Sequence, residues 1–149
     1  MDWPRARAWR SQLRGRLVFT NGVFDLLHRG HIDLLLGASR CGDALVVGVN
    51  SDDSVKRLKG RDRPVRPVTD RCYVLAALAM VDATVVFDQD TPFELISTLR
   101  PDVLVKGGDY TEPSIVGAAE VRAWGGDVVV VPLTPGHSTT STIERLRAT

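Results

Sequence analysis

The sequence is poor in the features that mark disulfide-rich, zinc-structured and membrane proteins. Its two cysteines, Cys41 and Cys72, lie far apart and belong to no CxxC or Cys/His cluster. This argues against a disulfide framework and a structural zinc site, and it favours a reducing compartment. No run of about 18 apolar residues occurs, so no membrane span is expected. The sequence therefore predicts a cytoplasmic protein without a membrane partner.

A strong net charge is also missing. The 149 residues carry a formal net charge of +1, which gives no reason to expect nucleic acid as a partner. The length predicts a single domain over residues 1–149, large enough to bury a core. The arginine-rich N-terminus lacks the apolar h-region of a secretory signal. Trp9, Leu13 and Leu17 recur at helical spacing, which predicts a helical extension over residues 1–15 that packs on the domain.

Short β-branched runs alternate with helical patterns along the chain. The expected strands are 16–20, 44–50, 84–87, 103–106 and 127–131. Helical patterns are expected at about 30–40, in a short stretch after Ser51, at about 69–80, from Pro92, from Pro113 to Gly125-Gly126, and after 138–141 toward Arg147. Strands separated by helices imply parallel pairing, and right-handed crossovers place helices on both faces. The predicted fold is α/β: a Rossmann-like doubly wound five-stranded parallel sheet. Ligands of such a sheet bind beyond the carboxyl ends of its strands.

The segment Thr91-Pro92-Phe93-Glu94 carries the signals of a helix start. Thr91 is the expected N-cap, Pro92 the first helical residue and Glu94 the partner in a capping box. Pro113 is expected to open the next helix in the same way, and Ser51 to cap the helix that follows the second strand.

The common nucleotide-binding fingerprints are absent. Neither GxGxxG nor GxxxxGK[ST] occurs, which argues against a dehydrogenase and a P-loop kinase. The first strand is followed instead by a turn with Gly22 and then by His28-Arg29-Gly30-His31 at the mouth of a helix. A helix N-terminus presents unpaired N–H groups to an anion, so a phosphate is the expected ligand. The plainer alternative is that the two histidines are surface or capping residues.

These residues resemble the signature of the cytidylyltransferase-like superfamily. Several further segments narrow the resemblance: Lys59-Gly60, Arg63-Pro64-Val65, Asp70-Arg71, Asp90-Thr91-Pro92, 101–110 and Ser138-Thr139-Thr140 occur in order. Together they resemble the D-glycero-β-D-manno-heptose 1-phosphate adenylyltransferases, including the adenylyltransferase half of bifunctional heptose kinase/adenylyltransferases. The resemblance implies transfer of AMP from ATP to the sugar 1-phosphate, giving ADP-heptose and pyrophosphate.

Two departures accompany this resemblance. The chain shows no kinase half, so a separate upstream sugar kinase is expected. Glycerol-3-phosphate cytidylyltransferases carry an Arg-Thr-Glu-Gly-Ile stretch before their Ser-Thr motif, whereas this chain has Leu133-Thr134-Pro135-Gly136-His137. The missing arginine weakens the cytidylyltransferase interpretation and leaves His137 as a candidate ligand contact.

The chemistry defines the expected roles of the residues. A sugar phosphate is mostly dianionic at neutral pH, because its second pKa is near ~6, so it needs no general base. Positioning and charge stabilisation should dominate. The expected catalytic residues are His28, His31, Lys59 and Arg71; the expected nucleotide-binding residues are Thr20, Asn21, Gly22, Val23, Phe24, Gly30, Lys106, Gly108, Asp109, Ser138, Thr139 and Thr140; the expected substrate-binding residues are Lys59, Arg63, Asp25 and Asn50.

Each role has a plainer alternative. Lys59 and Arg63 lie in a charged loop that solvent alone can accommodate, Ser138–Thr140 can be a helix cap, and Asp25 can organise the turn. No carboxylates stand at metal-cage spacing, so we expect no protein metal site and a Mg²⁺ carried by ATP. The resemblance also implies a homodimer.

Three other functions remain open at this level. The chain could be a cytidylyl- or guanylyltransferase that acts on another small phosphate, such as glycerol 3-phosphate or a different heptose phosphate. It could also be an FMN adenylyltransferase. A non-catalytic nucleotide-binding module is the third alternative, although such a module would be expected to lose a histidine or the Ser-Thr stretch, and this chain keeps both.

Overall fold

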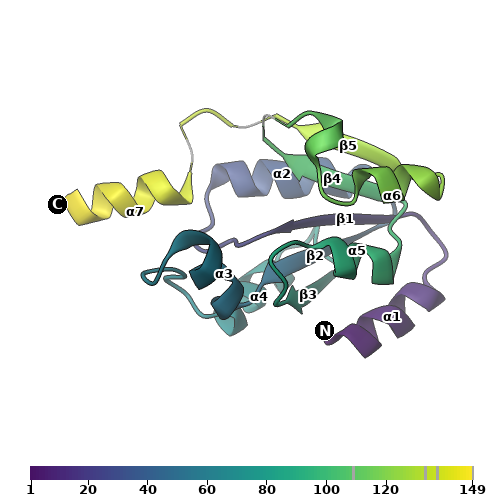
Figure 1. Cartoon of the computed structure of the whole chain (residues 1–149), viewed down its shortest axis with the longest axis horizontal. Helices are drawn as coiled ribbons and strands as arrows, with labels where there is room; N and C mark the ends of the chain where they lie inside the picture. Colours follow the sequence, from purple (N-terminus) through teal and green to yellow (C-terminus); the bar gives the residue numbers. More distant parts are fainter. Residues whose placement is uncertain (109, 133, 137, 149) are drawn as a thin grey trace.

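The chain folds around one sheet of five parallel strands (Figure 1). The computed structural model describes residues 1–108, 110–132, 134–136 and 138–148. The strands are β1 (Leu17–Gly22), β2 (Ala44–Asn50), β3 (Ala83–Phe87), β4 (Val103–Gly107) and β5 (Asp127–Val131), in the order β3-β2-β1-β4-β5. The order reverses between β1 and β4, and this reversal is where a doubly wound sheet binds its ligands. The predicted Rossmann-like fold is confirmed.

Helices cover both faces of the sheet. On one face α1 (Trp3–Gln12), α5 (Phe93–Leu99) and α6 (Ala118–Ala123) enclose a core around Phe19 and Leu104. On the other face α2 (Arg29–Ser39) and α4 (Val68–Ala76) enclose a core around Leu35 and Val47. Strand residues alternate between these two cores because successive side chains of a strand point to opposite faces. β2 is buried along its whole length, as its continuous apolar run predicts.

Two further helices lie at the carboxyl edge of the sheet (Figure 1). The first is α3 (Asp52–Lys59), where Ser51 caps the helix by accepting the N–H of Ser54, as predicted. The second is α7 (Thr139–Ala148), which extends away from the body of the molecule (Figure 1). Both helices therefore border the edge at which a ligand is expected.

The N-terminal helix packs on the domain and covers an edge strand. Ala6 is fully buried, and Trp3, Trp9 and Leu13 pack against the core. The indole of Trp3 donates to the carbonyl of Val86 at 2.8 Å, so α1 occupies part of the open edge of β3. The predicted helical spacing of Trp9, Leu13 and Leu17 is wrong for its last member, because Leu17 lies outside the helix. The helix ends at Gln12, and Leu17 begins β1 instead.

Two predicted helix starts are wrong. The N-cap of α5 is Pro92 and no side chain caps it, because the Thr91 hydroxyl reaches only the Phe93 N–H, at 3.4 Å. Pro113 lies in a short 3₁₀ helix, η1 (Glu112–Ser114). The α-helix that follows begins only at Ala118, after Gly117 takes a positive φ of +88°. Turn geometry after the proline, which the local signals do not encode, delays this helix by a full turn.

Candidate active site

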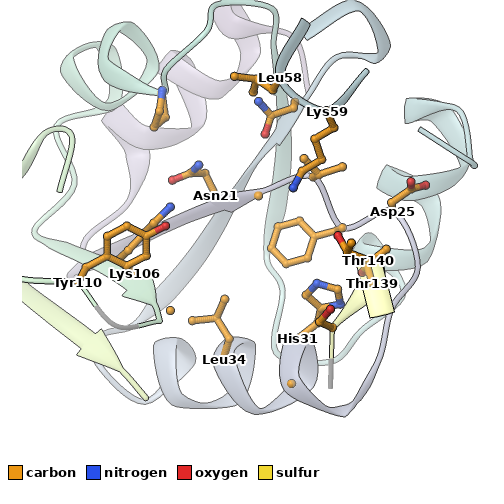
Figure 2. Close-up of a pocket in the computed structure, with 18 of the residues that line it drawn as sticks. Asn21, Asp25, His31, Leu34, Leu58, Lys59, Lys106, Tyr110, Thr139 and Thr140 are labelled. Atoms are coloured by element: carbon orange, nitrogen blue, oxygen red, sulfur yellow. The ribbon is translucent and has the colours of Figure 1, made fainter. Parts of the chain in front are cut away.

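A cavity of about 650 Å³ opens at the carboxyl ends of the five strands. Figure 2 shows His31, Lys59 and Lys106 approaching this space from three directions. Fifteen of the residues expected at the site line it: Asn21, Gly22, Val23, Phe24, Asp25, His28, Gly30, His31, Asn50, Lys59, Arg63, Lys106, Ser138, Thr139 and Thr140. Thr20, Arg71 and Gly108 are described but do not line the cavity. Asp109 and His137 lie outside the described residues.

The two histidines form a reciprocal capping box at the N-terminus of α2. His28 is the N-cap, and its Nδ1 accepts the N–H of Gly30 at 3.0 Å. His31 is the third helical residue, and its Nδ1 accepts the N–H of His28 at 3.3 Å. A neutral ring whose Nδ1 accepts carries its proton on Nε2. The histidines are therefore capping residues, and their caps at the same time fix the tautomer that donates from Nε2.

The environment keeps His31 neutral. Burial and the neighbouring charge of His28 lower the pKa of His31 to about 4. The two imidazoles stack with centroids 3.9 Å apart, and the ring of Phe24 lies 5.3 Å from that of His31. Near neutral pH, His31 can thus act as a hydrogen-bond donor without a formal charge.

The turn between β1 and the histidines is tightly packed. Phe24 is buried and takes a positive φ of 51°, which is uncommon for a bulky residue. A Cβ on Gly22 would lie 2.9 Å from the Phe24 ring, so only glycine fits there without a shift. The turn places Phe24 under His31 and brings the backbone of residues 21–24 to the cavity.

The Ser-Thr segment joins the same site. Ser138 accepts the N–H of Ser141 at 3.0 Å, as a cap does, and also lines the cavity. The hydroxyl of Thr139 donates to the carbonyl of Leu26 at 3.0 Å. This bond ties the start of α7 to the loop before His28, so two helix N-termini border the cavity. Such termini favour anions.

Asp25 holds the loop that follows α3. Its buried carboxylate accepts the Nε–H of Arg63 at 3.0 Å and the N–H groups of Val65 and Arg66 at 2.9–3.0 Å. Burial raises the pKa of Asp25, but these hydrogen bonds and the Arg63 charge outweigh burial and leave the pKa below its usual value. The carboxylate is thus occupied by the protein, which corresponds to the organising role that the sequence left open.

Arg71, expected among the catalytic residues, is buried away from the cavity. Its guanidinium donates to the carbonyls of Val23, Asn50 and Arg66 and to the carboxylate of Asp52 at 2.7–3.0 Å. All of these partners are protein groups at the ends of β1, β2 and the loop before α4. This placement corrects the expectation of direct contact with a phosphate, because Arg71 lies behind the wall of the site.

Lys59 and Lys106 are the remaining cations of the cavity. Lys59 is the last residue of α3 and is exposed. Lys106 is half-buried near the end of β4, and its Nζ lies 5.1 Å from the centroid of the Tyr110 ring. Burial lowers the pKa of Lys106. Within the described ranges, no carboxylate lies within ion-pair distance of either ammonium, which leaves both able to bind an anionic ligand.

The other expected nucleotide contacts have structural positions. Thr20 is fully buried in β1, and Gly108 has φ +122° and donates its N–H to Val131 at 3.0 Å, which prolongs the β4–β5 pairing. Asn50 lines the cavity while its amide donates to Ser54. Leu34, Leu58 and Val116 were not expected at the site and also line the cavity, as do Pro92, Tyr110 and Thr134 from segments noted in the sequence. Leu34 had a local signal, since it stands one helical turn after His31.

The described part of the chain holds no group of three or more His, Cys, Asp or Glu residues arranged to bind a metal ion. Over those same residues, none of the helices has the length and apolar character needed to cross a membrane.

The chain is similar to proteins of a known family. Residues 19–145 match the cytidylyltransferase-like family. The chain is 57% identical over 143 residues to "Bifunctional protein HldE" of Acidiphilium cryptum, covering 96% of the chain and 29% of that protein. It is 54% identical over 142 residues to the protein of the same name from Methylobacillus flagellatus, again with 95% and 29% coverage. The chain thus spans less than a third of the length of these relatives.

Two solved structures share the architecture. A lipopolysaccharide core biosynthesis protein from Thermoplasma volcanium superposes with a TM-score of 0.64 at 28% identity, covering 80% of this chain and 97% of that one. A pantoate-beta-alanine ligase from Francisella tularensis, solved with β,γ-ATP and β-alanine, gives a TM-score of 0.63 at 15% identity, covering 90% and 67%. The second likeness shows the fold alone.

Proposed function

The chain belongs to the cytidylyltransferase-like family of nucleotidyltransferases, and on this basis we propose that it transfers AMP from ATP to D-glycero-D-manno-heptose 1-phosphate. The products are ADP-heptose and pyrophosphate. The observation that carries the proposal is the histidine capping box at the cavity, in which each Nδ1 accepts a backbone N–H at one helix N-terminus and Nε2 is the donor nitrogen of each neutral ring. The identity of more than half of the residues to the HldE proteins supports the choice of acceptor.

The reaction needs stabilisation of charge more than proton transfer. An oxygen of the sugar phosphate attacks the α-phosphorus of ATP, and the bond from that phosphorus to the bridging oxygen of the β-phosphate breaks. The attacking phosphate is already ionised near pH 7, so no residue has to remove a proton. Negative charge develops on the α-phosphoryl oxygens and on the departing pyrophosphate. Preorganised N–H donors are the appropriate catalytic groups for such a transition state.

The lining residues supply those donors. His28 and His31 donate to phosphate oxygens from Nε2, and the N-terminus of α7 with Ser138, Thr139 and Thr140 holds the terminal phosphates. Lys59, Arg63 and Lys106 offset the charge of two anions that must approach each other. The backbone of residues 21–24 and Gly30 allows a nucleotide to lie close to the chain. Asn50, which also lines the cavity, contacts the sugar.

A divalent metal ion accompanies the nucleotide in this chemistry, and we take it to be Mg²⁺. The described carboxylates do not offer a cage for it. Asp25 is filled by three protein donors, and Asp90, the other cavity carboxylate, pairs with Arg57 at 3.0 Å. The donor set suits a Mg²⁺ whose oxygen ligands come mainly from the triphosphate itself, where it would neutralise part of the charge.

The substrate defines the neighbouring reactions. A sugar 1-phosphate must be supplied by a kinase that acts on a sugar, and we propose that such a kinase acts upstream. The site of action is the cytoplasm, where ATP is available. The partners are small molecules, with neither nucleic acid nor membrane among them, and the active form is a homodimer. Light scattering at micromolar protein concentration tests the dimer, which a mass of one chain would contradict.

A panel of pyrophosphate-release assays tests the function. Wild-type protein with Mg²⁺ is incubated with ATP, CTP or GTP and with heptose 1-phosphate, glycerol 3-phosphate or FMN. The proposal predicts release that is fastest with ATP and the heptose 1-phosphate and that requires both. Release with CTP and glycerol 3-phosphate, but not with the heptose, would instead establish a cytidylyltransferase.

A further inference from the structure

The loop between α3 and α4 is attached to the catalytic turn by one buried carboxylate. The side chain of Asp25 is fully shielded from solvent, and three donors of residues 63–66 converge on it. A buried carboxylate with this many donors is costly to leave unpaired, so its partners are strongly fixed. The attachment joins the turn that carries His28 to the segment that carries Arg63.

Arg63 uses only part of its hydrogen-bonding capacity in this contact. A guanidinium has five N–H donors in a rigid planar fork. Among the described residues, the sole acceptor bonded to the Arg63 guanidinium is the Asp25 carboxylate, through Nε at 3.0 Å. The Arg63 side chain is nonetheless only 11% exposed and lines the cavity. Both terminal nitrogens therefore belong to a largely desolvated side chain at the wall of the site and have no protein acceptor in the described ranges.

A second buried arginine fixes the same loop from behind. Arg71 donates to the carbonyl of Arg66 and to the carbonyls of Val23 and Asn50 at the ends of β1 and β2. The loop is thus attached to the sheet on one side and to the catalytic turn on the other. Free movement of Arg63 is restricted, which preorganises its guanidinium for bidentate binding of an anion.

We propose that Asp25 is a positioning residue that holds Nε of Arg63 so that the terminal N–H groups of Arg63 bind a phosphate group of a substrate. The inference rests on the proposed nucleotidyl transfer, which brings two phosphate-bearing substrates into the cavity. It revises the expectation that Asp25 contacts substrate itself. The phosphate belongs either to ATP or to the acceptor, and the two sources are separated by their own measurements.

Two measurements test whether Arg63 binds a phosphate group. They are calorimetric titration with Mg-ATP and the KM for the acceptor that is active in the panel. The Arg63→Ala variant should weaken one of the two ligands by at least tenfold, since a charge-assisted bidentate contact is lost. Arg63→Lys should lose nearly as much, because one ammonium cannot serve Asp25 and a phosphate at once. Arg61→Ala is the matched control, since Arg61 is exposed in the same loop and does not line the cavity. It should stay within twofold of wild type.

A double-mutant cycle tests the role of Asp25. Asp25→Asn should weaken the same ligand as Arg63→Ala, with kcat changed less than KM. The double variant should be no more than threefold weaker than Arg63→Ala alone, because Asp25 acts through Arg63. In ¹⁵N spectra, the slowly exchanging Nε–H resonance of Arg63 should disappear in Asp25→Asn; Asp25→Glu, which keeps the charge, serves if the amide variant does not fold.

Two results would overturn the inference. One is an Arg63→Ala variant within twofold of wild type for both ligands. The other is a double variant whose loss equals the product of the two single losses, which would mean that Asp25 supports only the fold. Absence of turnover with every acceptor would refute the proposed function instead, and Mg-ATP affinity alone would then decide the inference.

Discussion

The imidazole of His28 stacks on that of His31 at 3.9 Å between centroids, and each ring accepts a backbone N–H of the first turn of α2 through Nδ1. Each cap uses Nδ1 and fixes the orientation and tautomer of its ring, and the catalytic role proposed for these histidines uses the other nitrogen, Nε2. The two alternative interpretations of this motif, helix cap and phosphate ligand, describe two ends of one side chain.

The first prediction separates these two ends at His28. Asparagine is a good N-cap but has no donor at the position of Nε2. His28→Asn should therefore keep the free energy of unfolding within about 0.5 kcal/mol. It should lower kcat/KM by about 10²–10³-fold, as the loss of one oxyanion-type donor does. Urea unfolding and pyrophosphate release measure the two quantities. A variant with more than half of the wild-type turnover would refute the catalytic role of His28.

The second prediction concerns the pH dependence of stability. The folded pKa of His31, about 4, lies below the ordinary value of 6.5, so the unfolded chain binds more protons between these values. Stability is therefore complete above pH 6.5 and falls as the pH is lowered towards 4. Allowing for solvent screening, we expect a loss of about 1–2 kcal/mol from this group.

The comparison with His31→Asn isolates that loss. Asparagine can still accept the N–H of His28, but it does not titrate in this range. Urea unfolding without ligand gives the free energy of unfolding at several pH values. Below pH 6.5 this free energy should fall more steeply for the wild type than for the variant. An equally steep fall in the two proteins would contradict a neutral, partly buried His31.

The third prediction concerns Arg71. Replacement by methionine keeps much of the side-chain volume but leaves three carbonyls and the Asp52 carboxylate without their donor. Because the Asp52 side chain is 37% exposed, most of the cost in unfolding free energy comes from the carbonyls that lose their donor, at about 1–3 kcal/mol for each unsatisfied buried group. Urea unfolding measures the cost, with Arg61→Met as the exposed control. If Arg71 were a phosphate ligand instead, turnover would fall while stability stayed at the wild-type value.

The fourth prediction concerns Lys106. Its ammonium is half-buried, and the described residues give it no carboxylate partner. Lys106→Met removes this desolvated charge, so the melting temperature should stay the same or rise slightly. Affinity for a phosphate-bearing substrate should fall by about ten- to a hundredfold, the range for hydrogen bonds to charged groups. Differential scanning fluorimetry and calorimetry measure the two effects. A lower melting temperature with unchanged affinity would assign Lys106 to the fold.

Local sequence signals predicted most of the fold. The apolar run 44–50 is a strand with those bounds, because burial on both faces leaves a strong pattern. The β-branched run 127–131 is also a strand with the predicted bounds, although it lies at the edge of the sheet and is only partly buried. The signals failed where tertiary geometry decides. The Thr91 hydroxyl reaches only the N–H of Phe93, at 3.4 Å, and does not cap the helix. Leu17 continues the helical spacing of the sequence before it, but in the structure it pairs with Ala44 in the sheet.

The sequence could predict those cavity residues that local structure alone brings together. His28 and His31 are three positions apart in one helical turn, so their spacing alone places them together. Asp25 and Arg63 are 38 positions apart, and nothing in their separate surroundings indicates that one holds the other. Arg71 shows the converse problem. A sequence motif identifies an arginine that matters, but only the packing shows that it lies behind the cavity wall rather than in it.

The identity of the product tests the central claim most directly. Wild-type protein, Mg²⁺, ATP and D-glycero-D-manno-heptose 1-phosphate are incubated together, and the products are identified by mass spectrometry and ³¹P NMR. We predict ADP-heptose and pyrophosphate in equal amounts, with neither formed when the heptose phosphate is left out. ADP and inorganic phosphate as products, or no nucleotide sugar with ATP under any condition that binds both substrates, would contradict adenylyl transfer.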